Sequence, residues 1–204
     1  MAGEAMVIAD PAAAKIALRV FVRNRRKELA LEHPEAGWMV VDVAREPLAA
    51  RFPEPAGKVA AVYFGLGSEV ETRPLADWLV EQGWTLALPS VEDEDGHMVF
   101  RRWTPGDPLV HDQIGLNAPD PSRPMLEPDL VVAPLLAFDR QGRRLGQGGG
   151  YYDRALAALR TRRPVFMLGL AYVGQETQGL PDEPHDQRLD AILTESEYIA
   201  VQED

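Results

Sequence analysis

Short apolar runs that alternate with helical segments are the feature that most limits how this chain can fold. Residues 58–64, 130–134 and 165–171 are almost entirely apolar, and glycine, proline or charged residues bound them. Apolar runs of about four to eight residues are typical of strands that are buried on both faces. Because helices are expected between them, the pattern predicts an α/β fold with a mostly parallel sheet covered on both faces.

Proline and capping residues mark the ends of several expected elements. Asp10-Pro11 resembles a helix start, with a capping carboxylate before a proline in the first turn, and His33-Pro34 should end that helix. The second helix should be interrupted or shifted at Pro47. The expected helices are 12–32, 38–52, 72–82 and 151–160, and the expected strands are 58–64, 85–89, 99–103, 130–134, 165–171 and 191–194.

Size and composition indicate one domain spanning residues 1–204. The absence of cysteine excludes disulfides, thiolate zinc sites and thiol nucleophiles. A formal net charge of -11 argues against nucleic acid as a partner. No apolar run reaches the roughly 18 residues of a membrane span, and residues 1–10 lack the basic start of a secretory signal. We therefore expect a cytoplasmic protein without a membrane partner. We also expect it to be a monomer or a weak homodimer.

Residues 104–128 form a proline-rich connection between two expected strands. The segment contains six prolines, at 105, 108, 119, 121, 124 and 128. A loop of this length is uncommon in a small domain unless it has a function. Either a functional loop or a disordered surface flap fits the sequence.

The glycine-rich segment 142–154 carries the strongest chemical signal. Its glycines, at 142, 146, 148, 149 and 150, allow positive φ angles and let backbone N–H groups approach an anion. The helix that should follow adds unpaired N–H groups and its macrodipole. The segment is neither a Walker A sequence nor a dinucleotide-binding fingerprint. It predicts a phosphate-binding loop, although glycines that serve only the geometry of a turn are the alternative.

The order of these motifs resembles the 5-formyltetrahydrofolate cyclo-ligase (methenyltetrahydrofolate synthetase) family. The matching segments are Lys15 with Arg19, Glu69 to Thr72, Glu127-Pro128, Pro134 to Asp139, Gly142, Arg144 to Gly146, Gly148 to Arg154, Leu180 to Asp186, Leu189-Asp190 and Thr194-Glu195. The resemblance extends across nearly the whole chain. It implies a three-layer α/β/α domain related to the NagB, RpiA and CoA-transferase folds.

The resemblance also implies an activity: ATP-dependent closure of 5-formyltetrahydrofolate to 5,10-methenyltetrahydrofolate, with release of ADP and phosphate. Mg²⁺ would be the cofactor. A formyl oxygen is a poor leaving group, and phosphorylation makes it a good one that the folate N10 can displace. Such transfer depends on positioning and charge neutralisation more than on a protein nucleophile. A folate- or nucleotide-binding module without turnover and an unrelated phosphotransfer enzyme are the alternatives.

The family's catalytic and ATP-binding positions fall on the first helix and the glycine-rich loop. Lys15 and Arg144 are the catalytic candidates. The ATP-binding candidates are Lys15, Arg19, Arg144, Leu145, Gly146, Gln147, Gly148, Gly149, Gly150, Tyr151 and Tyr152. From spacing alone, Lys15, Arg19, Arg23 and Lys27 could be only a solvated basic stripe, and we assign Arg23, Arg25, Arg26 and Lys27 to that description.

The substrate and metal positions implied by the family lie on other segments. The substrate-binding candidates are Phe64, Glu69, Gln147, Gly148, Gly149, Gly150 and Tyr151. Gln147 stands where relatives commonly have an arginine or an aromatic residue. For Glu69 the alternative is that Ser68 or Thr72 caps the next helix, and the acids there only complement its dipole.

Asp153 and Asp186 are the Mg²⁺ candidates, since Mg²⁺ prefers carboxylates, phosphate oxygens and water. Asp153 could instead only cap the helix, and Asp186 could be an exposed loop acid. His185 and Asp190 are weaker metal candidates.

Overall fold

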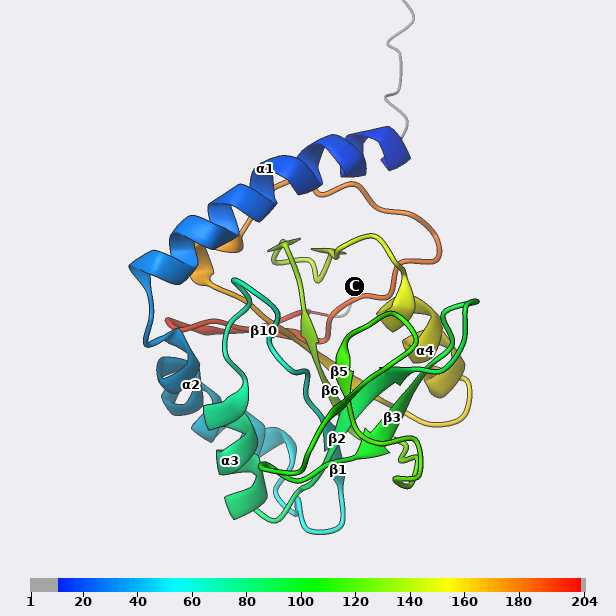
Figure 1. Cartoon of the computed structure of the whole chain (residues 1–204). Coiled ribbons are helices and arrows are strands. Elements are labelled where there is room, and N and C mark those ends of the chain that lie inside the picture. The colour runs from blue at the N-terminus through cyan, green and yellow to red at the C-terminus, as the bar shows by residue number, and fades with distance from the viewer. Residues whose placement is uncertain (1–10, 203–204) are drawn as a thin grey trace, which may run out of the picture.

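The computed structural model describes residues 11–202, with side chains described from residue 15 onward (Figure 1). Its centre is a seven-stranded sheet with the order β11-β10-β9-β6-β1-β2-β3. The strands of this sheet are β1 (Val59–Ala61), β2 (Thr85–Val91), β3 (Met98–Arg102), β6 (Leu130–Pro134), β9 (Phe166–Leu170), β10 (Ala191–Leu193) and β11 (Tyr198–Ala200). The other elements are α1 (Pro11–Glu32), α2 (Ala36–Arg51), α3 (Arg73–Glu81), α4 (Tyr151–Arg160), the 3₁₀ turn η1 (Val173–Gln175), and the strand pairs β4 (Val110–His111) with β5 (Asn117–Ala118) and β7 (Ala137–Phe138) with β8 (Arg144–Leu145).

The central strands are parallel, as the sequence predicts. β1 pairs in parallel with both β2 and β6, and β9 pairs in parallel with β6 and β10. Only the two edge strands, β3 and β11, are antiparallel to their neighbours. The sequence did not predict β11, which is only three residues long.

Helices cover both faces of the sheet and bury the alternating side chains of its strands. Leu130 and Val132 of β6 belong to the core on the side of α2 and α3. Val131 belongs to the core on the opposite side, where Leu156 of α4 packs. Fully burying one such aliphatic side chain stabilises the fold by about 1.5–3 kcal/mol. The expected three-layer α/β/α architecture is therefore confirmed.

Two expectations about element boundaries were wrong. α2 is not interrupted at Pro47, which lies inside the helix. The buried residues Ala44 and Leu48 flank Pro47, so packing outweighs the loss of the hydrogen bond that proline cannot donate. β1 ends at Ala61, earlier than residue 64, because the chain must leave the sheet to form the cavity wall described below. The capping role expected of Asp10 lies outside the described residues.

The proline-rich segment is ordered, which removes the alternative of a disordered flap. It contains the short β4–β5 pair, whose turn is stabilised by Asp112. One carboxylate oxygen of Asp112 accepts hydrogen bonds from the N–H groups of Ile114 and Leu116, and the other accepts one from Val91 at the end of β2. These bonds fix the turn beside the carboxyl end of β2.

α1 lies across the end of the sheet at which β6 terminates (Figure 1). Val22 of α1 is buried with Leu136, Leu145 and Leu180 in a small separate core. Leu29, near the other end of α1, belongs instead to the main core and lies against Gly174 of η1, so α1 is attached to the body of the protein at both places. Among the helices described, none is both long enough and apolar enough to traverse a lipid bilayer.

Candidate active site

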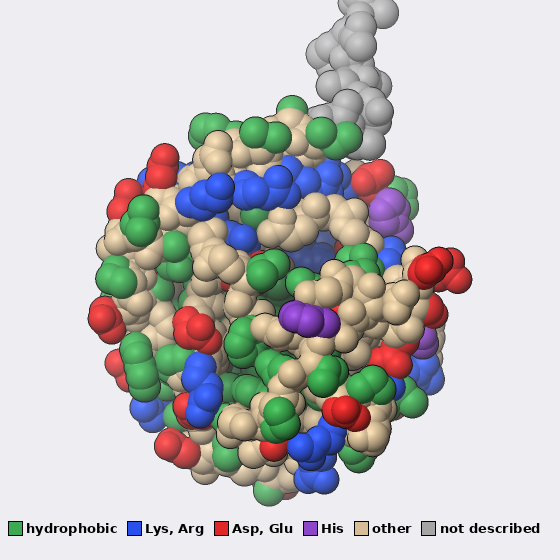
Figure 2. All heavy atoms as spheres, viewed as in Figure 1, with side chains coloured by type: hydrophobic (Ala, Val, Ile, Leu, Met, Phe, Trp, Pro, Cys, Tyr) green, Lys and Arg blue, Asp and Glu red, His purple; other side chains and the backbone are tan. Residues whose placement is uncertain are grey.

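A cavity of about 800 Å³ lies between α1, the glycine-rich loop and the carboxyl ends of the central strands. Figure 2 shows the hollow beneath a row of Lys and Arg side chains. Ligands of open α/β sheets bind at this end of the strands. The candidate residues from the sequence that line the cavity are Lys15, Arg19, Phe64, Glu69, Arg144, Leu145, Gly146, Gln147, Gly148, Gly149, Gly150, Tyr151, Tyr152, Asp153 and Asp186. The structure thus brings every one of them together.

The glycine-rich loop leads directly into α4, and glycine is required at several of its positions. Gly148 has φ 108° and Gly150, at the N-cap of α4, has φ 65°. A Cβ atom on Gly149 would collide with the ring of Tyr151. A Cβ atom on Gly146 would meet nothing within 4 Å, so turn geometry alone does not account for every glycine. The loop leaves its backbone beside the N-terminus of α4, where an anion is favoured.

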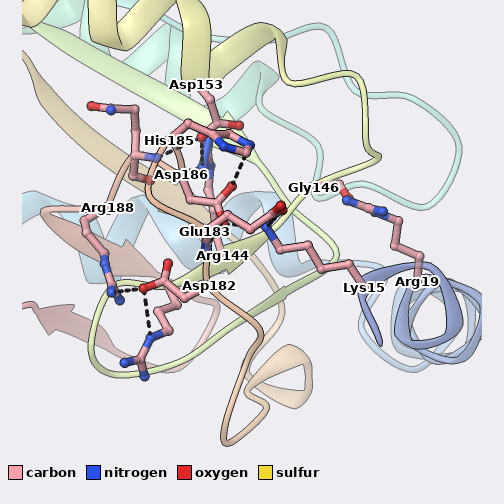
Figure 3. Close-up of polar contacts among 12 residues, drawn as sticks. Lys15, Arg19, Arg144, Gly146, Asp153, Asp182, Glu183, His185, Asp186 and Arg188 are labelled. Carbon is pink, nitrogen blue, oxygen red and sulfur yellow. Dashed lines mark hydrogen bonds and ion pairs between the residues drawn. The ribbon is translucent and has the colours of Figure 1, made fainter. Parts of the chain in front are cut away.

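Lys15 connects α1 to the segment on the opposite side of the cavity (Figure 3). Its Nζ atom lies 2.6 Å from Glu183 and 2.5 Å from Asp186. Burial lowers the pKa of Lys15, but the hydrogen bonds and charges of Asp186 and Glu183 raise that pKa by more, so the net shift is upward. Lys15 is therefore a buried cation rather than part of a solvated stripe.

Arg26 also lines the cavity, which corrects its assignment to a solvated basic face. Its side chain is 6% exposed and pairs at 3.2 Å with Glu69, which is 7% exposed. Arg26 also donates to the hydroxyl of Ser68 and to the carbonyl of Leu135. The signal in the sequence was the spacing Lys15, Arg19, Arg23, Arg26, which keeps all four on one helical face.

The capping alternative for the Glu69 region does not hold. Thr72 occupies the N-cap position of α3, but its side chain makes no capping hydrogen bond and donates instead to the carbonyl of Tyr63. The hydroxyl of Ser68 accepts from Arg26. Glu69 therefore faces the cavity as a charged acceptor already paired with a cation.

Arg144 and Asp153 form a further ion pair in the wall of the cavity. The Nη2 atom of Arg144 lies 2.8 Å from Oδ1 of Asp153, and the same oxygen accepts from the N–H of Gln187 at 2.9 Å. Burial lowers the pKa of Arg144, and the charge of Asp153 acts in the opposite direction. Since no side-chain cap is made at the start of α4, Asp153 does not serve as a simple helix cap.

Asp186 belongs to a cluster of potential metal ligands. One ligand atom each from Glu183, His185 and Asp186 lie within 4.8 Å of one another. Carboxylate oxygens are the donors that Mg²⁺ prefers, so Asp186 and Glu183 fit this ion, as does Asp153, which accepts from the N–H of Gln187, the residue after Asp186. Asp190, the weaker alternative, instead pairs with Arg160 at 2.7 Å and does not line the cavity.

Aromatic and aliphatic side chains complete the walls. Phe64 is 51% exposed, and its ring is available for stacking. Burial raises the pKa of the Tyr152 phenol, which keeps this group neutral. The cavity residues that the sequence did not identify include Tyr63, Arg23, Arg26, Ile114 and Leu116. Ile114 and Leu116 belong to the proline-rich segment, which therefore forms part of the site.

Comparisons with known proteins give one consistent result. A sequence model of the 5-formyltetrahydrofolate cyclo-ligase family matches residues 11–195. A relative from Haemophilus influenzae named 5-formyltetrahydrofolate cyclo-ligase is 33% identical, with 86% of this chain and 95% of the relative covered. Its Escherichia coli K12 namesake is 30% identical, with 86% of this chain and 97% of the relative covered. The structure of Aquifex aeolicus 5,10-methenyltetrahydrofolate synthetase superposes with a TM-score of 0.72 at 28% identity, covering 93% of this chain and 94% of the other.

Proposed function

Because this chain belongs to the 5-formyltetrahydrofolate cyclo-ligase family, we propose that it converts 5-formyltetrahydrofolate to 5,10-methenyltetrahydrofolate while ATP is hydrolysed to ADP and phosphate. The observation that carries this proposal is the single cavity that joins the glycine-rich loop, the cations of α1 and the Arg26–Glu69 pair. The end of the cavity at the glycine-rich loop suits phosphates, and the end at the Arg26–Glu69 pair suits a flat polar ring.

The reaction has two balanced steps. The formyl oxygen on N5 attacks the γ-phosphorus of ATP, the bond to the bridging oxygen breaks, and ADP leaves. The iminium phosphate that results is attacked at its carbon by N10, which closes the five-membered ring. Phosphate then leaves from that carbon with the bonding electron pair, and N10 gives up its proton.

Positively charged side chains would stabilise the transferring phosphoryl group. Arg144 is held by Asp153 and by the carbonyl of Gln187, so its guanidinium needs no reorganisation during the reaction. Lys15 is held by Asp186 and Glu183. Backbone N–H groups of residues 148–150 and the N-terminus of α4 would bind the phosphate oxygens.

Asp186, Glu183 and Asp153 would hold Mg²⁺ with the nucleotide. The ion would neutralise charge on the phosphates. The Oδ1 atom of Asp153 accepts from Arg144 and Gln187, and the Oδ2 atom of Asp186 accepts from Lys15 and from the N–H of Glu183. The second carboxylate oxygen of Asp153 and that of Asp186 would thus be available to bind Mg²⁺.

Glu69 would accept hydrogen bonds from the N–H groups of the pterin ring. Its carboxylate is fixed by Arg26 and also accepts from the N–H of Leu66. Phe64 and Tyr151 line the same cavity and offer aromatic faces for stacking on the pterin.

The test follows the absorbance of methenyltetrahydrofolate with purified protein, Mg²⁺, ATP and 5-formyltetrahydrofolate. We expect product and ADP in equal amounts, and no product when ATP or Mg²⁺ is omitted. Calorimetric binding of the folate without any consumption of ATP would point to a binding module instead. ATP turnover that folates neither alter nor require would point to a different phosphotransfer enzyme.

A further inference from the structure

The four cations of α1 that line the cavity, Lys15, Arg19, Arg23 and Arg26, are not equally neutralised. Lys15 and Arg26 pair with carboxylates. Arg19 and Arg23 have no carboxylate within 4.0 Å among residues 15–202, the part of the chain whose side chains are described. The chain carries 32 acidic residues against 21 lysines and arginines, so two neighbouring arginines without an acid indicate a place for an anionic ligand.

These two arginines contact different atoms of the glycine-rich loop. The Nε atom of Arg19 donates to the carbonyl of Gly146 at 3.0 Å. Arg19 also lies against Gly148, where a Cβ atom would be 3.3 Å from its guanidinium carbon. Arg19 therefore covers the backbone that we assign to phosphate. Arg23, one turn further along α1, instead donates to the side chain of Gln147 at 2.8 Å.

The contact with Arg23 sets the orientation of the Gln147 amide. Since Oε1 of Gln147 accepts from Nη2 of Arg23, the NH₂ group of the amide points to the other side and remains a donor. Apart from the hydrogen bond between them, the polar groups that Arg23 and Gln147 can offer to a ligand are therefore all N–H donors. A guanidinium beside an amide N–H is suited to a carboxylate.

We propose that Arg23 and Gln147 bind the glutamate carboxylates of the folate substrate at the rim of the cavity. This proposal rests on the proposed function, because a reduced folate carries a benzoylglutamate tail. Arg23 lies between Arg26, which holds Glu69 at the pterin end, and Arg19, which covers the phosphate loop. A folate whose pterin reaches Glu69 passes Arg23 as its tail leaves the cavity.

The experiment compares two substrates that differ only in the tail. Wild-type protein, Arg23→Ala and Gln147→Ala are assayed with 5-formyltetrahydrofolate and with 5-formyltetrahydropteroate, which has no glutamate. We expect Arg23→Ala to lower kcat/KM for 5-formyltetrahydrofolate about tenfold, the effect of one charge-assisted hydrogen bond. For the pteroate, kcat/KM should change less than about twofold, and KM for ATP should stay within the same limit. Gln147→Ala should give a smaller loss with the same dependence on the tail.

Two further variants make the result interpretable. Arg25→Ala removes an arginine of α1 that pairs with Glu28 and Glu32 and does not line the cavity, so it should behave as wild type with both substrates. Arg23→Lys keeps a positive charge and should recover part of the loss. An equal loss for both substrates, or a raised KM for ATP, would overturn the role of Arg23. If wild-type protein cyclises neither substrate, the proposed function itself fails.

Discussion

The Arg26–Glu69 pair provides the sharpest test of how the site is built. We consider Glu69→Gln, which keeps the shape of the side chain and removes its charge. At 3.2 Å and an effective dielectric of about 20, the attraction that is lost is about 5 kcal/mol. Glutamine can still accept one hydrogen bond from Arg26, but the guanidinium is left buried without a counter-charge. Breaking such a pair costs about 3–5 kcal/mol, and we expect the lower end.

Thermal unfolding measures this cost. For a chain of this size, about 3 kcal/mol corresponds to a fall in Tm of roughly 6–12 °C. Asp77→Asn is the matched control, because Asp77 pairs with Arg73 at 2.9 Å while both side chains are about half exposed. An exposed pair of this kind should contribute no more than about 0.5 kcal/mol. The double variant Arg26→Met/Glu69→Met should recover part of the lost stability, since it leaves no unpaired charge.

Equal losses of Tm in Glu69→Gln and Asp77→Asn would refute the reasoning, since burial would then have no effect on the strength of the pair. Glu69→Gln also tests the role of the Glu69 carboxylate in substrate binding. We expect Glu69→Gln to raise KM for 5-formyltetrahydrofolate more than KM for ATP. The reverse order would place Glu69 with the nucleotide.

Three other variants test separate parts of the structure. Arg144→Ala should lower kcat at least about a hundredfold with a much smaller change in folate affinity, and unchanged turnover would exclude a role in phosphoryl transfer. Burial raises the pKa of Tyr63 well above 10.0. Above about pH 10 the phenol therefore ionises in the unfolded chain but not in the folded protein, and the free energy of unfolding falls by up to about 1.4 kcal/mol per pH unit. Tyr63→Phe should therefore flatten the alkaline fall in denaturation free energy, and an unchanged slope would contradict this. Gly142→Ala places a Cβ atom 2.6 Å from a backbone oxygen, whereas Gly57→Ala, at a similar positive φ, meets nothing within 4 Å. Denaturant unfolding should show a larger loss for Gly142→Ala, and equal losses would mean that the steric contact is relieved.

The sequence predicted the layers of the fold because each layer has a local signal. β6 and α4 were predicted with the boundaries that the structure has, since an apolar run and a glycine-to-helix transition mark them. The continuation of α2 through Pro47 could not be predicted, because it depends on tertiary packing of Ala44 and Leu48. The three residues of β11 carry too short a pattern to be recognised.

The residues predicted for the site all line one cavity, but the sequence did not predict their partners or several other residues of the wall. Family resemblance identified residues such as Arg144 and Asp153, and all of them line one cavity. Their pairing depends on contacts between distant segments, which no local pattern specifies. Arg26 was misassigned for the same reason, since its counter-ion, Glu69, follows β1 and lies 43 positions away.

The bond between Lys15 and Asp186 joins side chains 171 positions apart in the chain. During synthesis on a ribosome, α1 emerges first, and the acids that neutralise Lys15 emerge almost last. The contact that holds Lys15 in the wall of the cavity can therefore form only after nearly all of the chain has been translated. A product that stops short of Asp186 contains the residues of β1 to β9 but lacks β10, β11 and the acid that Lys15 contacts in the wall of the cavity.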